Sequence, residues 1–288
     1  MDGRKSNEST KVVSRLVRGN TVHHSGCGPS VWTNSIWPHR VDPYTCLGLA
    51  VVGMAHMVGM RSRACHARKL YAGNRGSILM TVKHVLISDT HGNNTLLRDL
   101  PEGDVLIHCG DVTRYGSRAG LREFAEIYGA LPHKTKIMIA GNHDGCFLKH
   151  PEEARAIVAG AGIVYLQDEG IKVNGLKYWG IPWTPDFYGW HFMGDEEFLA
   201  EKWGSIPEDT DVIISHGPPR SILDAGVGGV SHFDIVSLVL QPQLNVFGHI
   251  HEGYGIQTVD ETTYINCSLL NDLYQPVNQP IAFDLPAI

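Results

Sequence analysis

Short runs of apolar residues alternate with amphipathic helical patterns from about residue 80 to the end of the chain. Five apolar runs, each followed at once by polar residues and glycine, are predicted to be buried strands at residues 84–88, 105–108, 136–140, 212–215 and 245–247. Strands that alternate with helices are typical of α/β proteins, in which helices cover a largely parallel sheet. We therefore predict an α/β fold.

The same pattern predicts four helices and two hairpins. Ser117 is a plausible N-cap for a helix with an apolar stripe at Leu121, Phe124, Ala125, Tyr128 and Leu131. Further helices are predicted from Pro151 onward and over residues 195–203 and 233–240. Segments 171–179 and 255–267 are predicted to be hairpins, with turn signals at Asn174-Gly175 and around Asp260. The sheets should therefore contain both parallel and antiparallel strands.

The first 79 residues show no such hydrophobic period, and they are basic whereas the rest of the chain is acidic. They carry 11 Lys and Arg against 3 Asp and Glu, whereas the remaining 209 residues carry 13 against 27. Their one apolar run, residues 47–58, is too short to span a bilayer. The segment is interpreted as a basic, disordered leader, as a transit-like peptide, or as sequence upstream of a true start at Met80. We predict one functional domain, residues 80–288.

The net charge and the cysteine content narrow the classes of partner and the cellular location that we expect for this chain. The acidic domain offers no basic face for a phosphate backbone, so no stable nucleic-acid binding and no membrane association are expected. A small substrate fits better, since bound cations can reverse the local potential of an acidic site. The six cysteines contain no CxxC pair and do not suggest a disulfide framework, so the expected location is the cytoplasm.

Candidate chemistry lies directly after the predicted strands. The sequence there reads Asp-Thr-His, Gly-Asp, Gly-Asn-His-Asp, His-Gly and Gly-His-Ile-His. Ligands of α/β sheets bind at the carboxyl ends of strands. Carboxylates, a carboxamide and imidazoles together suit manganese, iron or zinc, and the set is too large for one metal. The residues concerned are Asp89, His91, Asp111, Asn142, His143, Asp144, His216, His249 and His251.

This order of motifs resembles the calcineurin-like metallophosphoesterase superfamily. The segments GDVLIHCGDVT, LPHKTKIMIAGNHD, WGIPWTPDFYGWHF, ISHGPP and NVFGHIHEGYG resemble more closely its metallophosphoesterase-domain-containing group, related to a fetal-brain protein. The resemblance covers nearly all of residues 80–288 and none of the leader. It implies a four-layer α/β/β/α sandwich of two mixed β-sheets flanked by helices.

The resemblance also implies a role for each motif residue. Asp111 would bridge two divalent ions, most plausibly Mn²⁺, with Fe or Zn as alternatives. The ligands of the first ion would be Asp89, His91 and His251, and those of the second Asn142, His216 and His249. His143 would contact the substrate phosphate together with Asn142 and assist the leaving group, and Asp144 would orient His143.

Such a site predicts hydrolysis of a phosphodiester. A hydroxide bridging the two ions would attack phosphorus, and His143 would donate a proton to the departing oxygen. His143 and Asp144 each have a purely structural interpretation as well. In it, His143 only shapes its turn and Asp144 caps the loop. His108 lies inside an apolar strand and is interpreted as a hydrogen-bonded core histidine. His84, His133, His150, His191 and His232 belong to no motif and are interpreted as surface or packing residues.

An aromatic segment bears on the substrate. Six aromatic residues and two prolines fall within residues 179–192. They would form either a platform that stacks a nucleobase beside the metals or, slightly favoured, a hydrophobic plug between the two sheets. A platform would point to a nucleotide-like diester, including a cyclic nucleotide.

Two other functions compete with a phosphodiesterase. The same metal core serves phosphomonoesterases and protein phosphatases, although IAGNHD lacks the upstream Leu-Arg that resembles the protein phosphatases. A non-catalytic interaction module is the third hypothesis, but a scaffold has no chemical reason to keep every ligand together with the acid histidine. Catalysis is therefore favoured. The sequence does not determine the oligomeric state.

Overall fold

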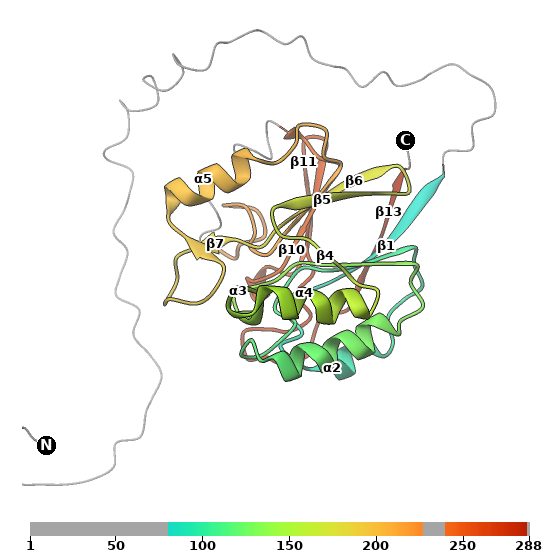
Figure 1. Ribbon diagram of the computed structural model, residues 1–288. Helices are drawn as coiled ribbons and strands as arrows, with labels where there is room; N and C mark the ends of the chain where they lie inside the picture. Colours follow the sequence, from blue (N-terminus) through green and yellow to red (C-terminus); the bar gives the residue numbers. More distant parts are fainter. Residues whose placement is uncertain (1–79, 227–239, 287–288) are drawn as a thin grey trace, which may run out of the picture. The chain divides into compact units, whose positions relative to one another are not determined.

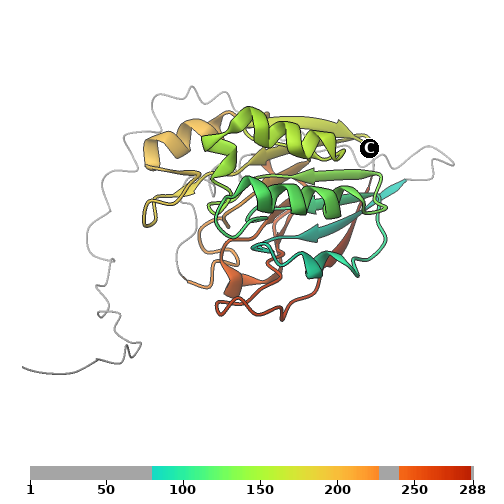
Figure 2. The ribbon, with the colours of Figure 1, turned by 60° about the horizontal axis from the view of Figure 1, so that its bottom comes forward.

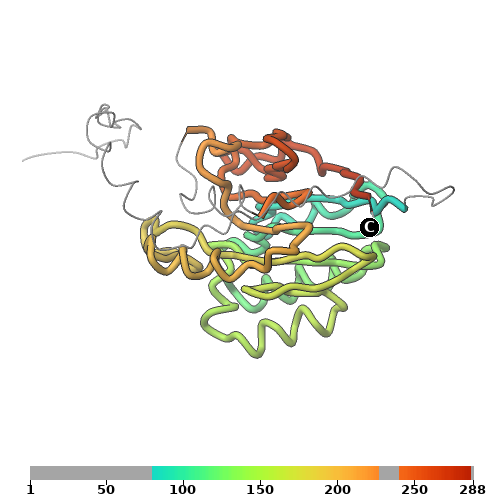
Figure 3. The backbone as a smooth tube through the Cα atoms, turned by 90° about the horizontal axis from the view of Figure 1, so that it is seen from above, coloured from blue at the N-terminus to red at the C-terminus, as the bar shows by residue number. Residues whose placement is uncertain are grey.

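Two mixed β-sheets carry most strands of the computed structural model, which describes residues 80–226 and 240–286 (Figure 1). The first sheet has the strand order β13-β1-β2-β3-β4, with β1 to β4 parallel and β13 antiparallel to β1. Its strands are β1 (Thr81–Ile87), β2 (Val105–His108), β3 (Thr135–Met138), β4 (Val164–Tyr165) and β13 (Ile281–Pro286). Figure 3 shows β1 in cyan and β13 in red near the C-terminus.

The second sheet has the order β11-β12-β10-β9-β6-β5. Its four central strands are parallel, and its edge strands are antiparallel to their neighbours. The strands are β5 (Glu169–Val173), β6 (Leu176–Ile181), β9 (Val212–Ser215), β10 (Leu244–Phe247), β11 (Gly255–Val259) and β12 (Thr262–Asn266). A separate short pair joins β7 (Thr184–Pro185) to β8 (Met193–Gly194).

Helices lie on the outer faces of both sheets. The helical elements are η1 (Asn94–Leu97), α2 (Arg118–Gly129), α3 (Cys146–Lys149), α4 (Pro151–Gly160), α5 (Glu196–Gly204) and η2 (His251–Gly253). Figure 2 shows α2 and α4 lying side by side. Among the described helices none is long and apolar enough to cross a membrane.

Three apolar clusters define the order of the layers. Val85 and Ile87 of β1 pack with the apolar stripes of α2 and α4, whereas Leu86 between them packs with residues of the second sheet. This alternation follows from the two-residue period of a strand. On the far side, Ile213 of β9 packs against Trp203 of α5. The order is therefore α2/α4, first sheet, second sheet, α5, which confirms the four-layer sandwich.

Several local signals read from the sequence are also confirmed. The Ser117 hydroxyl accepts a hydrogen bond from Gly120 N at 3.0 Å at the start of α2. Asp195, expected as the first residue of its helix, is instead the N-cap of α5, where it accepts from Phe198 N at 2.9 Å. Asn174 and Gly175 turn the β5–β6 hairpin with φ of 51° and 88°. The helix predicted over 233–240 lies almost wholly outside the described residues, as does the leader, residues 1–79.

Candidate metal centre

Loops that follow five strands bring the predicted site residues together. Asp89 and His91 follow β1, Asp111 follows β2, and the Gly-Asn-His-Asp segment follows β3. His216 follows β9, and the Gly-His-Ile-His segment follows β10. The first three loops belong to one sheet and the last two to the other, so the site lies where corresponding edges of the two sheets meet.

Several of these residues have an unusual backbone conformation. Asp89, His91, Asp111 and His249 have positive φ values of 56°, 45°, 57° and 67°. Non-glycine residues rarely adopt this left-handed conformation, and such strain persists only where the surrounding structure enforces it. It turns the chain sharply at each strand end, so that side chains two residues apart reach the same point.

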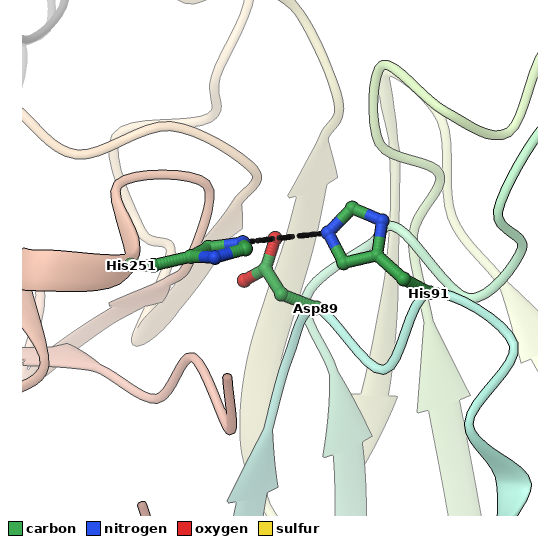
Figure 4. A group of neighbouring side chains, drawn as sticks. All are labelled: Asp89, His91 and His251. Carbon is green, nitrogen blue, oxygen red and sulfur yellow. Dashed lines mark hydrogen bonds and ion pairs between the residues drawn. The ribbon is translucent and has the colours of Figure 1, made fainter. Parts of the chain in front are cut away.

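One half of the site is formed by Asp89, His91 and His251. Figure 4 shows the two imidazoles on either side of the Asp89 carboxylate. The Nε2 atoms of His91 and His251 lie 3.3 Å apart. Asp89 Oδ1 lies 3.6 Å from His251 Nε2 and 3.9 Å from His91 Nε2. These three groups offer ligand atoms within 4.8 Å of one another, a spacing that suits one metal ion.

Asp111 joins this half to a second one. Its Oδ2 atom lies 3.6 Å from His91 Nε2 and 3.5 Å from His216 Nε2. His216 Nε2 in turn lies 2.9 Å from Asn142 Oδ1, and the His249 ring is centred 4.9 Å from the His216 ring. One carboxylate oxygen therefore stands between two groups of donors, which is the geometry of a bridging ligand.

Outer hydrogen bonds orient these donors as a metal site requires. His216 Nδ1 donates to the Cys109 carbonyl at 2.9 Å, and His251 Nδ1 donates to the Asn271 carbonyl at 2.8 Å. Both rings thereby present Nε2 to the site, as metal-binding histidines usually do. Asp89 Oδ2 accepts from Ser268 Oγ at 2.7 Å, whereas the buried Oδ1 has no hydrogen-bond partner. The donor set fits two divalent cations.

The charges of the cluster support the same conclusion. Burial opposes ionisation of Asp89 and Asp111, but the neighbouring imidazoles hold the pKa of both carboxyl groups below the ordinary value. Burial also opposes charge on His216 and His251, yet the carboxylates and backbone carbonyls raise the pKa of each to about 9. The two carboxylates thus attract positive charge, which bound cations would supply.

Two glycines make room for this cluster. A Cβ atom on Gly141 would collide with the Asp111 carboxylate, and one on Gly248 would collide with the Asp89 carboxylate. Both glycines belong to motifs named from the sequence. They are required because the Asp111 and Asp89 side chains occupy the space beside the backbone.

His143 lies at the edge of the cluster, with a ring nitrogen within 4.8 Å of ligand atoms of His91 and Asp111. Its backbone N–H donates to Asp111 Oδ1 at 2.8 Å, and its ring Nδ1 donates to the Arg114 carbonyl at 2.7 Å. Asp144 is buried, and its carboxylate accepts from Gly141 N, Val112 N, Thr113 N and Thr113 Oγ1. Burial and the nearby Asp111 raise the Asp144 pKa to about 6. Asp144 therefore fastens the loop of His143, and its orienting role would act through that loop.

Comparison with known proteins identifies the family. The model of the calcineurin-like phosphoesterase family matches residues 82–253. The chain belongs to that family. Metallophosphoesterase domain-containing protein 1 of Homo sapiens is 40% identical over 232 residues, which span 71% of each chain. A UPF0046 protein of Caenorhabditis elegans is 37% identical over 222 residues, spanning 71% of this chain and 76% of the relative.

Solved structures show the same fold at low sequence identity. The crystal structure of TT1561 of Thermus thermophilus superimposes with a TM-score of 0.53 and 12% identity. The similarity covers 73% of this phosphoesterase-family chain and 100% of that chain. It supports the architecture alone.

Two aromatic residues pack against the predicted site residues of this family member, and sequence reasoning missed one of them. The Tyr274 ring packs edge-on against His91 and His251, with centroid separations of 4.9 and 5.5 Å, and its φ is 59°. Trp190 stacks on His143 with the ring centroids 4.2 Å apart. The sequence marks Trp190 only as part of the aromatic segment, and no local pattern marks Tyr274.

The aromatic segment divides into two parts. Trp183 packs against the buried Phe192 and against Phe198 of α5, so this part is a hydrophobic plug. It lies against α5 and the outer clusters, not between the two sheets as expected, because the space between the sheets is already filled by strand side chains. Tyr188 and Trp190 are 86% and 36% exposed, and Trp190 lies at the rim of the centre against His143.

The other described histidines are packing or surface residues, as expected. His108 is buried, and its Nε2 lies 3.1 Å from Thr90 Oγ1. His84 pairs with the Tyr178 hydroxyl at 2.7 Å, and His133 donates to the Pro101 carbonyl at 2.9 Å. The ring of His191 fills the space beside Gly145. His150 is exposed, and His232 lies outside the described residues.

Proposed function

We propose that this protein is a metal-dependent phosphoesterase that hydrolyses phosphodiester bonds of a small, nucleotide-like substrate. The observation that carries the proposal is the position of Asp111 Oδ2, 3.6 and 3.5 Å from imidazole nitrogens of two different donor groups. A shared carboxylate of this kind is what a pair of cations needs. Membership of the calcineurin-like phosphoesterase family supports hydrolysis as the reaction.

Each residue group has a separate task in this proposal. Asp89, His91 and His251 would hold one cation, Asn142, His216 and His249 the other, and Asp111 both. When bound, two divalent ions, which we propose to be Mn²⁺, would supply the acidity that activates water and the charge that stabilises phosphoryl oxygens. His143 donates a proton to the leaving oxygen, because its Nδ1 is already engaged by Arg114 and its Nε2 remains for the substrate.

The exposed aromatic rings support a substrate with a planar group. Tyr188, Trp190 and Tyr274 are 86%, 36% and 50% exposed, and the last two adjoin predicted site residues. An exposed ring beside a phosphate site suits stacking of a nucleobase. We therefore propose nucleotide diesters, including cyclic nucleotides, as the class to screen, with the cytoplasm as the location.

Hydrolysis by the full chain tests the proposal. The protein is stripped of metal with a chelator, resupplied with Mn²⁺, and assayed with bis-p-nitrophenyl phosphate, p-nitrophenyl phosphate and cyclic nucleotides. We expect diester turnover that requires the metal, and a loss of at least about tenfold in kcat/KM for His143→Ala. His150→Ala is the matched control, since that side chain is exposed and outside the site.

The alternatives give different results. A preference for the monoester would favour a phosphomonoesterase, and binding of two metals without any turnover would favour an interaction module. Equal activity of His143→Ala and the wild type, at equal metal content, would remove His143 from the mechanism.

A further inference from the structure

The indole ring of Trp190 covers one face of the predicted proton donor. The rings of Trp190 and His143 are stacked, with centroids 4.2 Å apart and planes inclined by 29°. Trp190 belongs to the segment between β7 and β8, more than forty residues along the chain from His143. It is 36% exposed, so the stacked ring also borders solvent.

Two further contacts restrain the His143 ring. The edge of the His91 ring meets it at a centroid distance of 4.5 Å and an interplanar angle of 86°. Its Nδ1 donates to the Arg114 carbonyl at 2.7 Å. This hydrogen bond to the Arg114 carbonyl fixes the position of Nδ1, but it still allows the ring to rotate about the side-chain bonds of His143. Trp190 stacks on the face of the His143 ring and His91 meets it at a right angle, and together these two contacts fix the plane of the ring.

The segment that carries Trp190 is itself attached to the loop of His143. The backbone N–H of His191 donates to the Asn142 carbonyl at 3.3 Å. The His191 ring occupies the place where a side chain of Gly145 would be, since a Cβ atom there would lie 2.5 Å from the ring. Thr184 N donates to the Phe192 carbonyl at 2.8 Å and closes the segment at its base. Trp190 is thus positioned relative to His143 by its neighbours on both sides.

We propose that Trp190 is a positioning residue, which fixes the plane of the His143 imidazole so that Nε2 faces the leaving oxygen. The inference rests on the proposed function, in which His143 is the proton donor. A proton donor that is misplaced by about 1 Å can lose roughly a hundredfold in rate. Trp190 touches His143 by its ring face, so any flat aromatic side chain should preserve much of the effect, and an aliphatic one should not.

Kinetics of the full chain with Mn²⁺ and bis-p-nitrophenyl phosphate test the coupling. We expect Trp190→Leu to lower kcat about tenfold with little change in KM, and Trp190→Phe to retain kcat within about threefold. Phe187→Leu is the matched control, because Phe187 is 53% exposed in the same segment and its ring contacts Tyr188. In a His143→Ala background, Trp190→Leu should have no further effect on kcat. A further loss in that background, or a loss confined to KM, would show that Trp190 does not act through His143 and would overturn the proposal.

A spectroscopic measurement separates this inference from the proposed function. In the metal-free, histidine-labelled full chain, the His143 ring resonances are those missing from the spectrum of His143→Ala. The stacked indole should shift them, and Trp190→Leu should move them back while Phe187→Leu leaves them in place. Unmoved His143 resonances in Trp190→Leu would overturn the positioning role whether or not the wild type hydrolyses the ester. An inactive wild type with shifted resonances would instead refute the proposed function alone.

Discussion

His108 illustrates how one buried side chain couples this protein to pH. The ring is fully buried, packs edge-on against Phe124 with centroids 5.4 Å apart, and shares a hydrogen bond with Thr90. Burial lowers its pKa from 6.5 to about 3, because the apolar surroundings disfavour the charged imidazole. The folded protein therefore keeps His108 neutral at a pH where the unfolded chain already binds a proton.

The sign of the effect follows from that difference. The contribution of His108 to stability is complete above pH 6.5 and is lost as the pH falls toward 3, by about 1.4 kcal/mol per pH unit. Between pH 6 and pH 4, we expect the free energy of unfolding of His108→Gln to fall less steeply than that of the wild type. The reason is that unfolding of the variant takes up about one proton fewer. Urea unfolding of both proteins in chelator measures this, and parallel pH profiles would contradict it.

At the scale of single elements, helix caps stabilise the scaffold without entering the site. The Ser117 hydroxyl satisfies the N–H of Gly120 at the start of α2, and that helix supplies packing residues to the first apolar cluster. Capping matters here because the first N–H groups of a helix have no partner within the helix. The Ser117 cap should therefore affect the stability of the domain and not the chemistry of the candidate metal centre.

Removing this cap should change stability and leave catalysis intact. We expect Ser117→Ala to lower the free energy of unfolding by about 1 kcal/mol, with kcat and KM of the metal-loaded protein unchanged. Ser117→Asp, which keeps an acceptor at the cap, is the control and should remain close to the wild type. A large loss of activity in Ser117→Ala would mean that α2 positions the site more directly than its contacts indicate.

At the scale of the whole molecule, the candidate metal centre connects the two sheets. Asp89 and Asp111 follow strands of the first sheet, whereas His216 and His251 follow strands of the second. Asp111 Oδ2 and His216 Nε2 approach within 3.5 Å across this junction. Cations bound by both sets would therefore link the sheets in the folded state and have no equivalent site in the unfolded chain.

Metal binding should accordingly raise thermal stability. A cation at about a hundred times its dissociation constant adds roughly 2.7 kcal/mol, which for a domain of this size corresponds to roughly 5–10 °C in Tm. Calorimetry of the full chain with and without Mn²⁺ measures the shift. Asp111→Asn should abolish most of it, because Asp111 lies between both groups of donors. A shift of the same size in that variant would refute the bridging role.

Local patterns in the sequence already determined much of this architecture. The apolar runs predicted strands now seen as β1, β2, β3, β9 and β10, and the signals at Ser117 and Asn174-Gly175 marked a helix start and a hairpin. These features were predictable because they depend on residues close together in the chain. The motif residues at the strand ends were predictable for the same reason.

Other features depended on contacts between distant segments. Strand β13 pairs with β1 although about two hundred residues separate them, and its half-exposed sequence resembles an ordinary tail. Trp190 and Tyr274 gain their places from loops that fold onto the centre, where one stacks on His143 and the other packs on His91. The sequence by itself predicted which residues gather at the candidate metal centre. Only the tertiary structure decided which aromatic rings surround them, because such contacts are set by the packing of two sheets and leave no local period in the chain.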